Sequence, residues 1–396
     1  MTPLLYVGIA LVLLLAWING ANNAGNVVGV AVGARSISAK RALQVAFIFE
    51  IIGSVLLGHY VSTTIMRGII DPEKLGEDTL IKGVLVVALS ANLWMLTATY
   101  LRVPLSVTQA VVGGILGFGL TALGPRGIMW TSLISTMFSW PLTLLLAVLV
   151  SMLLYRLYSS ALSTIRKTTS LLVAFSTLLY ACMVFTLLLV LGSIGDQVLL
   201  HTAVVLIPIP VVLGYALLVK RSTRGDYYEA RYSVNKHLLL VSASLAALSH
   251  GAHDVGASAG LLQLLYNKLT ESPGVEAYTG VSRVVLLVSG FTIAMGMLNW
   301  GYRVLGTLAE RITPLTPESG FTAQFSAALT MLLVTRLGLP SSTTLAVTGA
   351  IIGVGLARGR GYINVKTVMR IFTTWIASFP ATLLISSTMS ALISLT

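Results

Sequence analysis

The chain has 396 residues, of which 56% are hydrophobic and only 10% charged, and its mean hydropathy is +0.90. Soluble domains carry about 25% charged residues, so this composition excludes an ordinary soluble enzyme and a disordered protein. Lys and Arg number 25 against 13 Asp and Glu, a net charge of +12, which we attribute to the cytoplasmic loops of a membrane protein and not to nucleic-acid binding.

Apolar runs of membrane-spanning length recur along the whole chain, and a helix needs about 20 such residues to cross a bilayer. They cover residues 4–33, 43–66, 79–101, 104–124, 128–155, 168–191, 197–219, 237–263, 283–302, 320–338, 340–357 and 371–394. The very short junctions at 102–104 and 338–340 leave re-entrant hairpins open as an alternative to full crossings. The sequence therefore predicts an all-α polytopic membrane protein with about twelve transmembrane or re-entrant segments.

The distribution of charge predicts an orientation in the membrane. Basic residues cluster near 35–41, 156–167, 220–236 and 358–370, whereas acidic residues concentrate near 71–78 and 271–276. With twelve crossings, all four basic clusters fall on one side, which the positive-inside rule makes cytoplasmic. We therefore expect a multi-pass protein of the plasma (cell inner) membrane with both termini extracellular.

The first run contains an unusually polar stretch, with Asn19, Asn22, Asn23 and Asn26 among glycine and alanine. Such a stretch predicts a break in the helix, which membranes tolerate where it lines a cavity. Amide oxygens and freed carbonyls are hard ligands for a small cation.

The second run contains a carboxylate, Glu50, between apolar neighbours. Burying it costs several kcal/mol unless it is paired, protonated or bound to a cation. A functional role is favoured over a hydrogen bond to a neighbouring helix.

The fourth run begins at Pro104 and continues with Ser106 and Thr108. Proline is favoured at the first position of a helix, and a helix N-terminus offers backbone donors and a partial positive charge to an anion. The hydroxyls add donors without a full charge. The alternative is an ordinary helix start whose hydroxyls pack against other helices.

The second half of the chain repeats these features. The stretch 20–25 resembles the stretch 251–256. A second match has a constant offset of 236 residues: Pro104, Ser106 and Thr108 recur as Pro340, Ser342 and Thr344, with Thr343 between the last two. The predicted topology inverts the second copy, an arrangement typical of secondary transporters. We therefore expect repeats at 1–155 and 237–396, joined by linker helices and a basic cytoplasmic loop at 156–236.

In the second copy the polar stretch is ionisable. Asp254 is a functional candidate by default within an apolar run, although a structural pairing with His253 or His250 is the alternative. His253 could titrate near neutral pH, whereas His250 is interpreted as a packing residue.

These motifs resemble those of the inorganic phosphate transporters of the PiT type, a family of cation-coupled phosphate symporters. The signature of that family is roughly Gly-Ala-Asn-Asp-x-Ala-Asn, followed in each half by Pro-x-Ser-Thr-Thr-His. The departures of this chain from the signature include Asn23 for Asp, Val107 for Thr, Gln109 and Leu345 for His, and His253 and Ala257 for Asn.

The resemblance implies a symporter that moves phosphate with Na+ or H+ by alternating access. It implies phosphate binding by Ser106, Thr108, Ser342, Thr343, Thr344, Asn22, Asn26 and His253. It implies cation coupling by Asp254, Glu50 and Asn23, with Asp254, Asn22 and Glu50 as ligands if the ion is Na+. The expected partners are phosphate, the coupling cation and the lipid bilayer. The resemblance also suggests a homodimer.

Other functions remain open at this point. The substrate could be sulfate or another oxyanion, and the same helix ends could serve a passive anion channel or a membrane sensor that transports nothing. An enzyme is not expected, and neither is a bound cofactor, because the chain has no Gly-Lys-Ser/Thr phosphate loop and no ligand cluster with zinc spacing.

Overall fold

The computed structural model describes residues 3–101, 105–165, 168–191, 208–223, 226–270, 280–303, 305 and 312–394. Within these ranges the chain is helical, with short 3-10 turns and a single isolated β-bridge between Ile70 and Ile128. Three features of the sequence prediction lie outside the described residues: Pro104, the start of the run 197–219, and the acidic segment 271–276.

Each predicted apolar run coincides with a helix or a helix pair. The helices are α1 (Pro3–Gly33), α2 (Ala39–Leu57), α3 (His59–Arg67), α4 (Glu77–Tyr100), α5 (Val107–Leu123), α6 (Trp130–Thr164), α7 (Thr169–Leu191), α9 (Pro208–Ser222), α10 (Tyr227–Leu269), α11 (Arg283–Trp300), α13 (Pro317–Arg336), α14 (Thr343–Arg358) and α15 (Val365–Ser394). The run 43–66 is the pair α2 and α3, which meet at a bend of 63°. The all-α membrane fold is confirmed.

Among the described helices, seven are long and apolar enough to cross a membrane, or eight if the bent pair counts as one span. Helices α5 and α14 are shorter, with 17 and 16 residues. A full crossing takes about 20 residues, so these two helices fit the re-entrant alternative.

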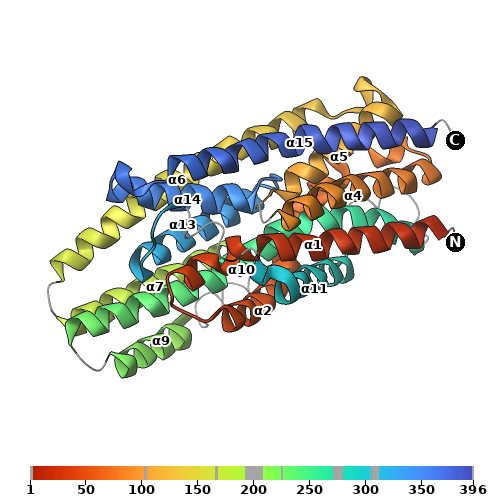
Figure 1. Ribbon diagram of the computed structural model, residues 1–396. Coiled ribbons are helices and arrows are strands. Elements are labelled where there is room, and N and C mark those ends of the chain that lie inside the picture. The colour runs from red at the N-terminus through yellow and green to blue at the C-terminus, as the bar shows by residue number, and fades with distance from the viewer. Residues whose placement is uncertain are drawn as a thin grey trace.

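The helices form an elongated bundle in which the two ends of the chain lie on the same side (Figure 1). Helix α1 runs away from that side, whereas its counterpart α10 runs towards it. Likewise, α4 and α5 occupy the side with the termini, and α13 and α14 occupy the opposite side. Corresponding helices therefore run in opposite directions, as inverted repeats require.

The two hairpins α4–α5 and α13–α14 meet inside the bundle. Thr344 Oγ1, at the start of α14, lies 3.1 Å from the carbonyl oxygen of Leu105, just before α5. Both tips are buried, with Leu105 1% exposed and Thr344 0% exposed. The hairpin tips are thus interior contacts between the two halves.

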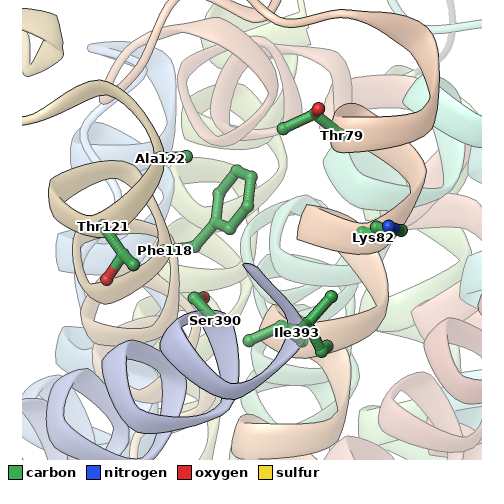
Figure 2. Close-up of a pocket in the computed structure, with 8 residues that line it drawn as sticks. Thr79, Lys82, Phe118, Thr121, Ala122, Ser390 and Ile393 are labelled. Atoms are coloured by element: carbon green, nitrogen blue, oxygen red, sulfur yellow. The ribbon is translucent and has the colours of Figure 1, made fainter. Parts of the chain in front are cut away.

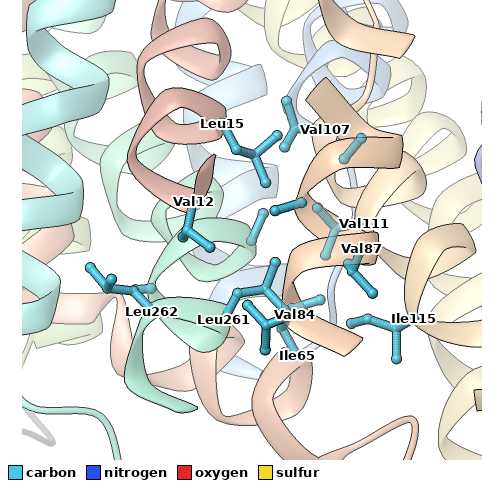
Figure 3. Packing of buried hydrophobic residues seen from close by; sticks show 14 of the residues in the cluster. Val12, Leu15, Ile65, Val84, Val87, Val107, Val111, Ile115, Leu261 and Leu262 are labelled. Atoms are coloured by element: carbon cyan, nitrogen blue, oxygen red, sulfur yellow. The ribbon is translucent and has the colours of Figure 1, made fainter. Parts of the chain in front are cut away.

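An apolar core surrounds the first hairpin (Figure 3). Val12 on α1, Val84 on α4, Val111 on α5 and Leu261 on α10 are all buried in it, together with Ile65 on α3. Side chains from both halves of the sequence fill this core, so the repeats are packed into each other.

The predicted helix breaks in the polar stretches are wrong, because α1 and α10 continue through them without interruption. The glycines serve close helix packing instead. A Cβ added at Gly20 on α1 would lie 1.8 Å from Ile293 O on α11, and one at Gly296 would lie 1.8 Å from Trp17 O.

The long helix of the second half, α10, packs in the same way against α2. A Cβ at Gly251 on α10 would lie 2.0 Å from Glu50 O on α2, and one at Gly53 would lie 1.9 Å from Leu248 O. Each long helix therefore contacts a helix of the opposite half at backbone distance. This approach fixes the height of Glu50 against α10.

The predicted position of proline at the first helical residue is also wrong for the second hairpin. Helix α14 begins at Thr343, and Ser342 is its N-cap, so Pro340 lies two residues before the cap. A serine cap satisfies a free backbone N–H, which proline cannot do.

Replacing Gly53 with alanine is expected to destabilise the protein by about 1–3 kcal/mol, because the new methyl group must push α2 away from the backbone of α10. The matched change Gly214→Ala, in α9, has no atom within 4 Å of the added Cβ. It is expected to be neutral or stabilising. Thermal unfolding of the two purified variants checks this, and equal midpoints would contradict the packing role of Gly53.

Candidate functional site

Polar side chains gather where the hairpin tips meet the long helices. This central polar cluster comprises Asn19, Asn22, Asn23 and Asn26 on α1, Glu50 on α2, His250, His253 and Asp254 on α10, and Thr343 and Thr344 on α14. Every member is at least 96% buried. Since buried polar groups are costly unless paired, their partners decide what the site can do.

In the first half, Asn22 holds the tip of its hairpin with two hydrogen bonds. Its Nδ2 donates to Thr99 Oγ1 at 3.0 Å, near the end of α4. Its Oδ1 accepts the backbone N–H of Leu105 at 3.0 Å. One side chain on α1 therefore ties both arms of the first hairpin.

In the second half, His253 makes the same two connections. Its Nε2 accepts the backbone N–H of Ser341 at 3.1 Å. A backbone N–H can only donate, so Nε2 carries no hydrogen and Nδ1–H is the donor to Thr335 Oγ1, 2.8 Å away. The residue that departs from the family signature thus keeps the two bonds of an amide, and both ring nitrogens have partners.

A carboxylate–imidazole–carboxylate group occupies the α2–α10 contact. His250 Nδ1 lies 2.8 Å from Glu50 Oε1, and Nε2 lies 3.2 Å from Asp254 Oδ2. The second contact is too poorly aligned for a regular hydrogen bond, so Nε2 has no hydrogen-bond partner. Thr343 Oγ1 also donates to Asp254 Oδ2, at 3.3 Å.

The two carboxylates of this group are only partly satisfied. Glu50 Oε2 and Asp254 Oδ1 are buried without a hydrogen-bond partner. Among the described residues, no Lys or Arg forms an ion pair with either carboxylate. With both carboxylates ionised and His250 protonated, the group would carry one net negative charge, which is costly in a buried site. A bound cation or a further proton would neutralise it.

Three asparagine side chains along α1 form a chain of hydrogen bonds that ends at the second hairpin. Asn23 Nδ2 donates to Asn19 Oδ1 at 2.7 Å, and Asn26 Nδ2 is 2.5 Å from Asn23 Oδ1. Asn26 Nδ2 also lies 2.7 Å from Thr344 Oγ1. At the other end, Asn19 Nδ2 donates to Asp254 O at 3.2 Å. One hydrogen-bonded network therefore connects Asp254 to the tips of both hairpins, and Glu50 adjoins it through the contact between His250 and Asp254.

The two halves differ in charge at equivalent positions. A spacing of 231 residues relates Asn19 to His250 and Asn23 to Asp254. Both pairs are four residues apart on one helix, yet the first is a neutral amide pair and the second is charged. The ionisable groups of the cluster are thus confined to the α2–α10 side.

The predicted anion ligands at the helix starts are buried at the hairpin tips. Ser106 Oγ caps α5 by accepting Gln109 N at 3.3 Å, and Ser342 Oγ caps α14 by accepting Leu345 N at 3.4 Å. Thr108 lies in the first turn of α5 and is 2% exposed.

The cluster is closed in this structure. A void of about 10 Å³ lies beside Asn26, His250 and Thr343, which is close to the volume that one water needs, about 10–15 Å³. A phosphate-sized ligand requires the tips to separate.

The second tip has further support from α6. Trp140 Nε1 donates to Pro340 O at 3.0 Å, and Thr143 Oγ1 is 2.7 Å from Ser341 Oγ. Because Trp140 belongs to the first half and the tip to the second, this contact joins the two halves.

His250 lies between the two buried carboxylates, so the pairing of Asp254 with His250 that the sequence left open is present in the structure. The spacing of four residues between His250 and Asp254 on one helix was the available signal. The network also includes Asn19, Thr99, Thr335 and Ser341. The two threonines bond Asn22 and His253, and these bonds could be recognised only once the positions of the hairpin tips were known.

Comparison with known proteins supports the fold and the motifs. The model of the phosphate transporter family matches residues 19–386. A protein of Pyrococcus abyssi (strain GE5 / Orsay) named "Putative phosphate permease" is 32% identical, with 98% of this chain and 97% of that protein covered. The chloroplastic inorganic phosphate transporter 2-1 of Arabidopsis thaliana is 30% identical, covering 92% of this chain and 68% of that protein.

One solved structure is similar over its whole length. It is described as the sodium-dependent phosphate transporter, and it superimposes with a TM-score of 0.93 at 30% identity, with 100% of both chains covered. The expected resemblance and the helical architecture are therefore both confirmed.

Replacing His253 with leucine is expected to release the second hairpin tip, because Ser341 N–H loses its acceptor. Losing a buried hydrogen bond costs about 1–3 kcal/mol, so exchange of the Ser341 amide with deuterium is expected to accelerate about tenfold or more. His253→Asn is expected to keep most of the protection.

The amide of Leu105, which Asn22 holds, is the internal control. It is expected to stay protected in His253→Leu and to exchange faster in Asn22→Leu. Unchanged exchange at Ser341 in His253→Leu would show that His253 does not hold the tip.

Proposed function

The chain belongs to the phosphate transporter family, and on this premise we propose that it is a secondary active transporter. It carries inorganic phosphate together with Na+ or H+ by alternating access. The observation that carries this proposal is the contact between Thr343 on the second hairpin and Asp254 in the charged group. This contact joins the candidate anion site to the candidate cation site.

Charge balance gives a reason for coupling. With both carboxylates ionised, the Glu50–His250–Asp254 group lacks one positive charge, and phosphate brings further negative charge into the same buried region. In a low-dielectric site such charges repel strongly, so phosphate binds well only when a cation is also present. This differential affinity is what links the two gradients.

The cation is proposed to bind between α2 and α10. Glu50 Oε2 and Asp254 Oδ1 have no hydrogen-bond partner and are available oxygens. Asn22 Oδ1 accepts from Leu105 N, whereas Asn23 Oδ1 accepts from both Asn26 and Thr344. An amide oxygen has two lone pairs, so Asn23 would have to release a partner before it could serve as a ligand.

Na+ is the first candidate for the coupling ion, because the similar solved structure is described as sodium-dependent. H+ is the alternative, because the same two carboxylate oxygens could take up a proton.

Phosphate is proposed to bind where the two helix N-termini converge. Ser106 and Thr108 on one tip, and Ser342, Thr343 and Thr344 on the other, would supply hydroxyl and backbone donors. Asn26 would add an amide on α1. His253 would contribute by holding the Ser341 backbone in place, since both of its ring nitrogens already have partners.

Alternating access is proposed to move the repeats 1–155 and 237–396 against each other, with 156–236 as the linker. Opening on one side exchanges the internal bonds of Thr343 and Thr344 for bonds to phosphate. The protein is proposed to lie in the plasma membrane with both termini outside, and a homodimer is the proposed assembly.

The variants Asp254→Asn and Glu50→Gln are expected to lower cation-driven phosphate uptake into proteoliposomes at least about tenfold. Each removes one carboxylate of a buried group, and breaking such a group costs about 3–5 kcal/mol. Size-exclusion elution identifies any variant that fails to fold.

Glu73→Gln is the matched control, because Glu73 is an exposed acidic residue that lies in a short 3-10 turn outside the central polar cluster. It is expected to behave as wild type. Wild-type uptake by both Asp254→Asn and Glu50→Gln would refute the assignment of the cation site.

Sulfate is the second candidate substrate, because the tips offer neutral donors that any tetrahedral oxyanion could use. We expect excess sulfate to leave uptake of labelled phosphate nearly unchanged, whereas excess arsenate or unlabelled phosphate competes. Strong inhibition by sulfate at the same concentration would favour an oxyanion transporter of broader specificity.

A further inference from the structure

A separate pocket opens at the end of the bundle that carries both termini, between α4, α5 and α15 (Figure 2). Its volume is about 280 Å³, close to the roughly 300–1,000 Å³ of small-molecule sites. Eight residues line it: Thr79, Lys82, Val86, Phe118, Thr121, Ala122, Ser390 and Ile393. None of them belongs to the central polar cluster.

The polar side of the pocket is made of hydrogen-bond donors. Lys82 is exposed, and no carboxylate of a described residue lies within 4.0 Å of its ammonium group. Glu77, one turn earlier on α4, pairs with Lys268 instead. Thr79 precedes Lys82 by three residues and so lies on the same face of the helix.

Across the pocket, α15 supplies a buried hydroxyl without a partner. Ser390 is 7% exposed, and its Oγ has no hydrogen-bond partner. Thr121 Oγ1 on α5 already donates to Gly117 O at 3.0 Å. The free donors are therefore Lys82, Thr79 and Ser390, which suit an anion with several acceptor oxygens.

The rest of the wall is apolar. Phe118, Val86 and Ile393 face the same hollow (Figure 2 labels Phe118 and Ile393). Beside the pocket, Leu392 on α15 is 61% exposed. Exposed apolar side chains on spanning helices face lipid, so the hollow lies within reach of lipid headgroups.

The other half of the chain does not repeat the unpaired lysine of this pocket. The repeat spacing of 236 residues places Glu318 at the position of Lys82, and Glu318 pairs with Arg231 at 2.7 Å. An ion pair there satisfies both charges, whereas Lys82 has no carboxylate of a described residue within 4.0 Å.

We propose that this pocket binds a phosphate group, with Lys82 as the counter-charge and Ser390 as the buried donor. Lysine is a common phosphate ligand that acts as a point charge, and three donors match the several acceptor oxygens of a phosphate. The group belongs either to the headgroup of an anionic phospholipid or to inorganic phosphate. Because the pocket shares no residue with the transport site, its failure would leave the proposed transport function intact.

The experiment measures how fast a water-soluble succinimidyl ester acylates Lys82 in the purified full-length protein, with mass spectrometry as the readout. The baseline is the protein in maltoside micelles with diacylglycerol, which has acyl chains but no phosphate. One arm replaces diacylglycerol with phosphatidylglycerol, and another adds inorganic phosphate at constant ionic strength. Lys74, an exposed lysine just before α4, is the internal reference.

We expect acylation of Lys82 to slow severalfold in at least one arm, while acylation of Lys74 stays constant. Slowing by phosphatidylglycerol alone identifies the lipid headgroup, and slowing by inorganic phosphate identifies the free anion. Ser390→Ala is expected to raise the ligand concentration for half-maximal protection about tenfold, because it removes a hydrogen bond to a charged group.

Three results would overturn the proposal. The first is an unchanged acylation rate of Lys82 in both arms. The second is equal slowing at Lys74, which would indicate a general surface effect. The third is undiminished protection in Ser390→Ala, which would place the ligand outside the pocket.

Discussion

The structure depends on how side chains hold the two buried hairpin tips. Each tip exposes a backbone N–H at depth, and an unpaired buried donor costs about 1–3 kcal/mol. Asn22 and His253 each accept one such N–H and bond a threonine on the same hairpin. The long helices α1 and α10 can supply these side chains at the right height because glycines let them approach α11 and α2 at backbone distance. The close packing of the long helices and the hydrogen bonds to the hairpin tips thus favour the same arrangement of helices.

This constraint accounts for two of the departures from the family signature. Histidine at 253 has an acceptor and a donor nitrogen, so it replaces an amide without leaving a group unpaired. Asn23 cannot carry a charge, and it joins a chain of neutral amides instead. Glu50, His250 and Asp254 place the carboxylates of the pseudo-symmetric centre at the contact between α2 and α10.

Much of the fold could be predicted from the sequence, because twelve apolar runs and a repeated proline-serine-threonine motif are local signals. The site was only partly predictable. Residues such as Asp254 and Thr344 were identified by their polarity in apolar runs, but the place of His250 depends on Glu50, which is 200 residues away in the chain. The continuity of α1 and α10 was missed, because glycine in a polar stretch indicates a helix break and close helix packing equally well.

The central claim is that a cation gradient drives phosphate transport through this cluster. The most direct test is the steady-state accumulation of labelled phosphate in proteoliposomes of the wild-type protein, with Na+ and pH gradients imposed separately at a clamped membrane potential. Accumulation above the external concentration under one of these gradients, which collapses when that gradient is dissipated, is the predicted result. Phosphate that only equilibrates under both gradients would contradict coupling and indicate a passive anion channel.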